Sequence, residues 1–131
     1  TKKTLVSKVS KFWRAMKCRV KMISPELHDL VLSETSHLPH LVSFALVNII
    51  LNTKSIKNIK DYTGGGFKDF ARLAHSDGIM WGDICRTNEK NIVTSINMLI
   101  KELSLIKNMV KSNDKSLRLY LNGIKAKLDK K

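Results

Sequence analysis

Apolar residues recur every three or four positions through most of this chain, which is the spacing of amphipathic helices. The helices expected from this spacing span residues 4–16, 25–52, 67–75, 77–86, 89–111 and 114–128. The pattern therefore predicts a mainly α-helical fold. The length of 131 residues suits one domain with a core and excludes a complete two-domain enzyme.

The helix expected from residue 25 onward carries a clear start signal and a clear break signal. Ser24, Pro25 and Glu26 supply an N-cap, a proline at the first helical position and an acid in the first turn. Pro39 lacks an amide donor and its ring clashes with the preceding turn, so a break or kink is expected there. The apolar run 41–51 then predicts a buried helix, because it is far shorter than the roughly 20 residues that cross a bilayer.

The segment after the first helix alternates apolar Cys18, Val20 and Met22 with basic Arg19 and Lys21. This period of two predicts a β-strand. One strand cannot form a sheet, and no other segment has a convincing strand pattern. We therefore interpret the first helix and this strand as the closing unit of an α/β sheet whose other strands are absent.

The longest expected helix carries more apolar surface than one neighbouring helix covers. Its main seam follows a heptad spacing of 4, 3, 4, 3 and 4 through Ile92, Ile96, Leu99, Leu103, Ile106 and Val110. Further apolar residues lie off this seam, at Val93, Met98, Ile100, Leu105 and Met109. Because exposed apolar area is unfavourable, the pattern predicts a homodimer formed through helices. The alternative is a helix enclosed within its own monomer.

The charge is strongly positive but lies mostly at the two ends of the chain. Lysine and arginine total 24 against 11 acidic residues, a formal net charge of +13. Residues 1–23 contain eight basic and no acidic side chains, whereas residues 24–100 are nearly neutral. Only five of the basic residues are arginine, the side chain that nucleic-acid recognition favours. We therefore interpret the positive charge as a solvated lysine-rich surface, and a basic nucleic-acid-binding domain is the least favoured of the functional hypotheses.

Two cysteines, Cys18 and Cys85, stand alone without a CxxC motif or histidines at metal-ligand spacing. The sequence therefore indicates neither a disulfide framework nor a zinc site. No signal-peptide pattern precedes the first helix, so we expect a cytoplasmic protein that does not span a membrane.

Three of the four histidines fall within thirteen positions, at His28, His37 and His40. Ser36 and His40 are four residues apart and share a helical face if the helix persists past Pro39. A hydroxyl, an imidazole and freed backbone groups suit the binding of a hydroxylated, anionic small molecule. The alternative for each histidine is a hydrogen-bonded structural role. Since no acid stands at a triad position, a hydrolase is not indicated.

A glycine-rich segment, 64–72, is the second candidate site. Gly64, Gly65 and Gly66 lead into a helix start, where backbone amides attract anions, and Arg72 offers a bidentate partner for a carboxylate. The alternative is a flexible turn in which Arg72 pairs with Asp69. The segment is neither a GxGxxG motif after a strand nor a P-loop.

Together these motifs resemble the C-terminal half of the prephenate dehydrogenase family. The resemblance rests on His28-Asp29, the SHLPH run 36–40, the GGGFKDFAR run 64–72, Ser76-Asp77, Met80-Trp81, Asp83-Ile84 and Asn88. It implies oxidative decarboxylation of prephenate to 4-hydroxyphenylpyruvate in tyrosine biosynthesis, with NAD or NADP as cofactor; some members prefer arogenate. It also implies a Rossmann domain for the cofactor, followed by an all-helical domain that supplies the dimer interface and part of the substrate pocket.

The resemblance implies two parts in this chain and a role for each matching residue. Residues 1–23 would be the terminal helix–strand unit of a missing Rossmann domain, and 24–131 the helical dimerisation and substrate-binding domain. Arg72 would bind a carboxylate of the dicarboxylate substrate prephenate. Ser36 and His40 would line the pocket, Gly65 and Trp81 would shape it, and Asp69 would reach it across the dimer; His28 and His37 would be structural.

The chain departs from the family pattern in three respects. It has no dinucleotide glycine fingerprint, no ribose-binding acid and no copy of the family's upstream catalytic histidine. We therefore expect no catalytic, cofactor-binding or metal-binding residue in this chain, and no activity by the chain alone. The alternative is a free-standing helical dimer with an interaction or regulatory role.

Overall fold

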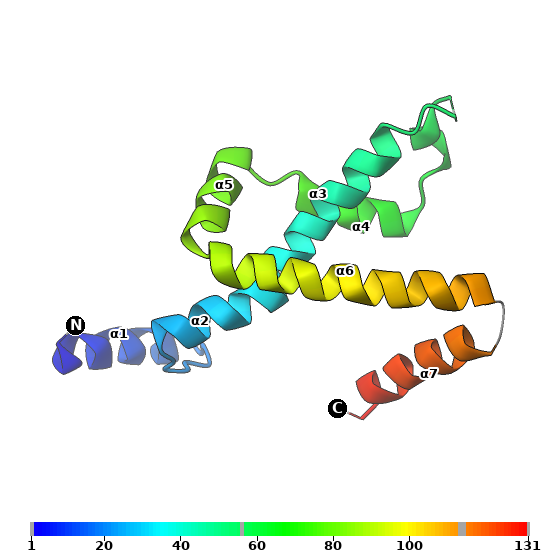
Figure 1. The fold of residues 1–131 in the computed structure, drawn as a ribbon. Coiled ribbons are helices and arrows are strands. Elements are labelled where there is room, and N and C mark those ends of the chain that lie inside the picture. The colour runs from blue at the N-terminus through cyan, green and yellow to red at the C-terminus, as the bar shows by residue number, and fades with distance from the viewer. Residues whose placement is uncertain (1, 56, 113–114, 131) are drawn as a thin grey trace.

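The computed structural model describes residues 2–55, 57–112 and 115–130. The elements are α1 Lys3–Ala15, α2 Pro25–Leu32, η1 Ser33–His37, α3 Leu38–Leu51, η2 Ile59–Tyr62, α4 Gly65–Ala74, α5 Gly78–Thr87, α6 Glu89–Ser112 and α7 Ser116–Leu128. The short η1 is a π-helix and η2 is a 3-10 helix. Helices α3 and α6 cross near the centre, α4 packs on α3, and α7 turns back beneath α6 (Figure 1). The mainly helical prediction is confirmed.

The predicted helix starts rest on caps that the structure contains. The Ser24 hydroxyl accepts from the Leu27 amide at 3.2 Å, at the start of α2. The Asp77 carboxylate accepts from the Met80 amide at 2.8 Å, at the start of α5. Each cap satisfies an amide that has no partner inside its helix. The expected start of the last helix at 114 lies outside the described residues.

The predicted break at Pro39 is absent, and α2, η1 and α3 follow one another directly from Pro25 to Leu51. The distortion lies one turn earlier, in the π-helix η1, where the Leu38 amide donates to the Ser33 carbonyl five residues back. Pro39 is the second residue of α3 and, as a proline, has no amide to donate to the preceding turn. The wider π turn absorbs the proline without ending the helix.

The predicted strand at 18–23 is wrong, and the described residues contain no strand. Helix α1 ends with Lys17 in the left-handed region at φ 61°, and the Cys18 amide donates to the Trp13 carbonyl at 3.0 Å. The chain then folds back over α1, where the Ser10 hydroxyl contacts the Met22 sulfur at 3.7 Å. Alternating side chains do not make a strand when no neighbouring strand supplies the backbone hydrogen bonds.

The apolar run 41–51 is not the buried helix that the sequence predicts, because Ser43 is the only fully buried residue of α3. Trp81 and Ile92 are the only buried apolar side chains of the described chain. The chain exposes 11149 Å², whereas a compact monomer of 14.9 kDa exposes about 7,000 Å². A large apolar surface is therefore left for partners to cover.

Of the described helices, the continuous Pro25–Leu51 segment is long and apolar enough to cross a membrane. This criterion considers only length and composition, and the core helices of soluble proteins also meet it. Polar side chains interrupt the segment at Ser33, His37 and Ser43, and all three are buried within the chain. The expectation that the protein does not span a membrane stays a prediction.

Candidate functional site

A buried polar cluster joins the long helix to the α5–α6 corner. Its side chains are almost inaccessible to solvent, with exposures of 0% for Ser33, 9% for His37, 6% for Asn88 and 3% for Ser95. The Ser95 hydroxyl of α6 donates to the Ser33 hydroxyl at 3.2 Å, and Ser33 in turn donates to the Leu30 carbonyl at 2.7 Å. Small side chains at this crossing let α6 approach η1 closely.

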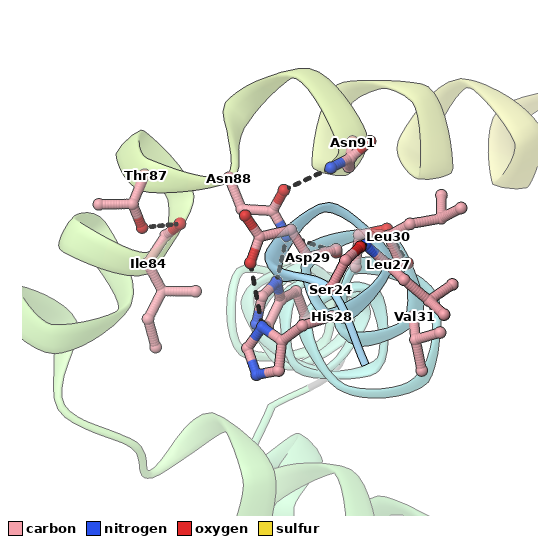
Figure 2. Close-up of polar contacts among 12 residues, drawn as sticks. Ser24, Leu27, His28, Asp29, Leu30, Val31, Ile84, Thr87, Asn88 and Asn91 are labelled. Carbon is pink, nitrogen blue, oxygen red and sulfur yellow. Dashed lines mark hydrogen bonds and ion pairs between the residues drawn. The ribbon is translucent and has the colours of Figure 1, made fainter. Parts of the chain in front are cut away.

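Asn88 ends α5 and precedes α6, and its side chain connects three segments. The side-chain nitrogen Nδ2 of Asn88 donates to the backbone carbonyl of Asp29 at 2.7 Å and lies 3.3 Å from His37 Nδ1. The Asn88 side-chain oxygen accepts from the Asn91 amide nitrogen at 2.8 Å. Figure 2 shows this side chain directed from the α5–α6 corner toward α2. All of its hydrogen-bonding groups are thus used, as expected for a buried amide.

The contact with Asn88 determines the protonation of His37. Because the amide nitrogen of Asn88 donates, His37 Nδ1 must accept, and the ring is neutral with its proton on Nε2. Burial lowers the pKa of His37 below 6.5, and the nearby His28 and His40 lower it further; Asp29 acts in the opposite direction but is outweighed. The expected structural role of His37 agrees with its burial and hydrogen bonding.

Trp81 of α5 lies against both His37 and His40. The His40 ring stacks on the indole with centroids 4.2 Å apart and an interplanar angle of 26°. The His37 ring meets the indole edge to face, at 5.9 Å and 82°. Trp81 is 7% exposed, and its indole N–H is buried without a partner among the described residues. The indole therefore supports the His40 ring at the candidate site.

Ser36 and His40 share a helical face, as the spacing predicts. His40 Nδ1 donates to the Ser36 carbonyl at 3.0 Å, which leaves Nε2 of the neutral ring as the atom able to accept a hydrogen bond. Ser36 and His40 are both half-buried, so a small ligand can reach them. The sequence offers no acid to orient His40, and the structure shows that a backbone carbonyl does so instead.

Arg72, Asp69 and Gly65 lie on α4, which packs against α3. All three residues are exposed, and no ion pair between Arg72 and Asp69 is found among the described residues. Within the same part of the chain, no hydrogen bond or ring contact joins these residues to His40 or Trp81. The guanidinium is therefore available to a ligand or to a second chain.

The glycines at the start of α4 do not fit a dinucleotide site. The 3-10 helix η2 precedes them, whereas a dinucleotide fingerprint follows a strand. A Cβ added at Gly64, Gly65 or Gly66 meets nothing within 4 Å, so these residues do not line a tight cradle. We derive no cofactor step from this chain.

An apolar groove runs between α3 and α6. It has a volume of about 360 Å³ and is lined by Leu38, Leu41, Val42, Ala45, Leu46, Ile49, Ile96, Leu99 and Leu103. Three of these residues, Ile96, Leu99 and Leu103, belong to the predicted heptad seam. The seam therefore borders an open apolar surface rather than being enclosed within the single chain.

The sequence did not indicate that Asn88 connects three segments, nor that His37 is held by a hydrogen bond from Asn88. The bond between them joins residues 51 positions apart, which helical periodicity does not detect. Two signals were available: Trp81 and Asn88 are seven residues apart, and His37 and His40 are three apart, so each pair shares a helical face.

The neutral state of His37 predicts that stability depends on pH. The folded pKa lies below that of the unfolded chain, so the unfolded state binds more protons as the pH falls below about 6.5. The free energy of unfolding should be highest above this pH and should decrease below it. Urea unfolding at several pH values tests this expectation. His37→Phe should flatten the decrease, whereas His28→Phe, a change at an exposed histidine, should leave most of it.

Comparisons with known proteins agree with one another. Residues 24–122 match the family model for the prephenate dehydrogenase dimerization domain. The chain is 31% identical over 115 residues to prephenate dehydrogenase of Bacillus subtilis, covering 87% of this chain and 31% of that protein. It is 30% identical over 111 residues to cyclohexadienyl dehydrogenase of Zymomonas mobilis, covering 83% and 38%.

Solved structures show the same helical architecture. Aquifex aeolicus prephenate dehydrogenase in complex with hydroxyphenyl propionate and NAD+ superposes with a TM-score of 0.87 at 40% identity, covering 99% of this chain and 46% of that one. Synechocystis arogenate dehydrogenase shares the fold with a TM-score of 0.82 at 19% identity, covering 99% and 48%. This chain thus spans less than half the length of these relatives. The chain belongs to the prephenate dehydrogenase family and contains its dimerization domain.

Proposed function

We propose that this chain is the dimerising, substrate-binding part of a prephenate dehydrogenase. The single observation that carries the proposal is the half-buried His40, stacked on the buried indole of Trp81 and bonded to the carbonyl of half-buried Ser36. Two half-buried polar residues beside a fixed aromatic side chain suit a hydroxylated ring. The Aquifex aeolicus relative, at 40% identity, was crystallised with hydroxyphenyl propionate, which is such a ring.

In the proposed site Arg72 binds a carboxylate of prephenate. The guanidinium is exposed and has no acidic partner among the described residues, so two of its N–H groups can form a bidentate pair. His40 Nε2 accepts from the ring hydroxyl, while Trp81 limits the position of the ring. These residues bind and orient the substrate; orientation alone lowers a reaction barrier by several kcal/mol.

A homodimer formed through helices completes the proposal. The excess of about 4,000 Å² over a compact monomer exceeds the area that one chain usually contributes to a permanent dimer interface. The α3–α6 groove supplies an apolar centre for that interface. Asp69 is exposed on α4, and we place it at the partner's pocket. The remaining exposed apolar face of α1 is available to a cofactor-binding domain.

The dinucleotide cofactor, NAD or NADP, belongs in this proposal to a part of the enzyme outside this chain. When bound, it accepts the hydride from prephenate. The purified chain should therefore give no turnover with prephenate and either cofactor. Genuine turnover in a spectrophotometric assay would contradict the proposal.

The two unpaired cysteines, Cys18 and Cys85, are compatible with the proposed cytoplasmic location.

The carboxylate role of Arg72 is tested by substitution. Loss of a charge-assisted bidentate contact costs about 2 kcal/mol, so Arg72→Ala should weaken prephenate binding roughly 30-fold in calorimetry. Arg86→Ala is the matched control, because Arg86 is an exposed arginine that already pairs with Asp83. Equal affinity in Arg72→Ala and the unaltered chain would remove Arg72 from the site.

A further inference from the structure

We propose that His37 and Asn88 are positioning residues that orient the ligand-facing imidazole of His40 through Trp81. The inference rests on the proposed function, since it concerns the same pocket. His37 and Asn88 do not touch the ligand in this scheme. They determine where the His40 ring lies, while the Ser36 carbonyl determines which of its nitrogens is free.

The first step is the matching of two helical faces. Trp81 and Asn88 are seven residues apart, the first inside α5 and the second at its C-cap. His37 and His40 are three residues apart, at the end of η1 and the start of α3. Each pair therefore lies on one face of its helix. The two faces meet so that His37 contacts both Asn88 and Trp81.

The second step is that Asn88 has only one consistent orientation. Its oxygen accepts from Asn91 and its nitrogen donates to the Asp29 carbonyl, as Figure 2 shows. Turning the amide over would place two oxygens against each other at Asp29 and two nitrogens at Asn91. The remaining N–H therefore faces His37 Nδ1, and the His37 ring is held in one tautomer and one rotation.

Trp81 connects the His37 ring to His40, because the indole contacts both imidazoles. The edge-to-face contact with His37 limits the tilt of the Trp81 indole, and the opposite restraint on the indole is its stack with His40 at 4.2 Å. The Ser36 carbonyl restrains the rotation of the His40 ring by accepting a hydrogen bond from Nδ1. His40 is thus oriented by one backbone group and by a chain of contacts that begins at Asn88.

This arrangement uses polar groups where apolar ones would stabilise the chain as well or better. Asn88 and His37 are both buried, and the buried indole N–H of Trp81 has no partner among the described residues. Buried polar networks give a unique side-chain arrangement rather than extra stability. A role in orienting a ligand-binding ring accounts for their presence at this position.

The test combines imidazole NMR with ligand binding in the full chain. In the unaltered protein above pH 7, nitrogen chemical shifts should show His37 protonated on Nε2 and His40 protonated on Nδ1. His37→Phe retains a ring against Trp81 but removes the acceptor, and Asn88→Ala removes the donor. In each variant the ring at position 37 is no longer held by Asn88, so the ring-current shift of the His40 protons stacked on the indole should diminish, and the affinity for hydroxyphenyl propionate should fall about tenfold.

Matched controls separate positioning from general damage. Asn97→Ala changes an exposed asparagine of α6, and His28→Phe changes an exposed histidine of α2; both should preserve the His40 shifts and the affinity. An unchanged ring-current shift of His40 and an unchanged affinity in folded His37→Phe and Asn88→Ala would overturn the inference. If neither variant folds, the shifts of the unaltered chain decide, since an Nδ1-protonated His37 contradicts the inference. Failure of the unaltered chain to bind hydroxyphenyl propionate would instead count against the proposed function.

Discussion

Leu99→Arg is expected to convert the proposed dimer into a monomer. Leu99 lies in the apolar groove between α3 and α6, where the second chain would exclude water from the introduced guanidinium. An unpaired charge in such an interface costs about 4 kcal/mol, which corresponds to nearly a thousandfold increase in the dimer dissociation constant. Light scattering at tens of micromolar should show the mass of a dimer for the unaltered chain and of a monomer for the variant.

Two further substitutions make this result specific. Asn97→Arg places the same charge on an exposed position of α6 outside the groove and should leave the dimer intact. Leu99→Ala shortens the side chain without adding charge and should weaken the dimer by a smaller factor. A dimer that persists with Leu99→Arg would move the interface away from this groove, and a monomeric unaltered chain would refute the proposed dimer itself.

Local signals in the sequence predict the helices and their starts because local interactions determine them. Ser24 caps the helix that it was expected to cap, and Asp77 caps the helix expected from residue 77; both bonds span three residues. The face shared by Ser36 and His40 follows in the same way from helical geometry. At Pro39 the local rule favoured a break, but a π turn next to the proline preserves the helix.

Features that depend on distant partners were not accessible from one sequence. The alternating segment 18–23 has the side-chain pattern of a strand, but no neighbouring strand pairs with it in the described chain. The run 41–51 has the composition of a buried helix, yet much of it stays exposed because a covering chain is required. Asn88 and His37 were similarly hidden, since their contact spans 51 residues.

The sequence predicts only some of the contacts among the proposed pocket residues, because the others depend on distant partners. His40 and Trp81 stack on each other, so two residues selected by motif also meet in space. Arg72 and Asp69 lie on α4 without a contact to that pair in the described chain. The roles proposed for them depend on a ligand and a second protomer, which the single chain does not contain.

Trp81→Ala is expected to cause the largest loss of stability among single substitutions in this chain. Trp81 is one of two buried apolar side chains of the described residues, and it contacts both imidazoles of the site. Replacing a buried tryptophan by alanine costs about 3 to 5 kcal/mol, whereas small domains have about 5 to 15 kcal/mol in total. Urea unfolding followed by far-ultraviolet circular dichroism, at one fixed protein concentration, measures the loss.

Trp81→Phe distinguishes the ring from its N–H group. Phenylalanine keeps an aromatic face for His40 and removes the buried indole N–H that has no partner in the described chain, so the cost should be at most about 1 kcal/mol. Trp13→Ala is the matched control, because Trp13 is 47% exposed on α1 and should lose little. Equal losses for Trp81→Ala and Trp13→Ala would show that the α5 indole is not the centre of this core. A large loss in Trp81→Phe would instead show that the indole N–H bonds to an acceptor in solution, most directly one from the second protomer.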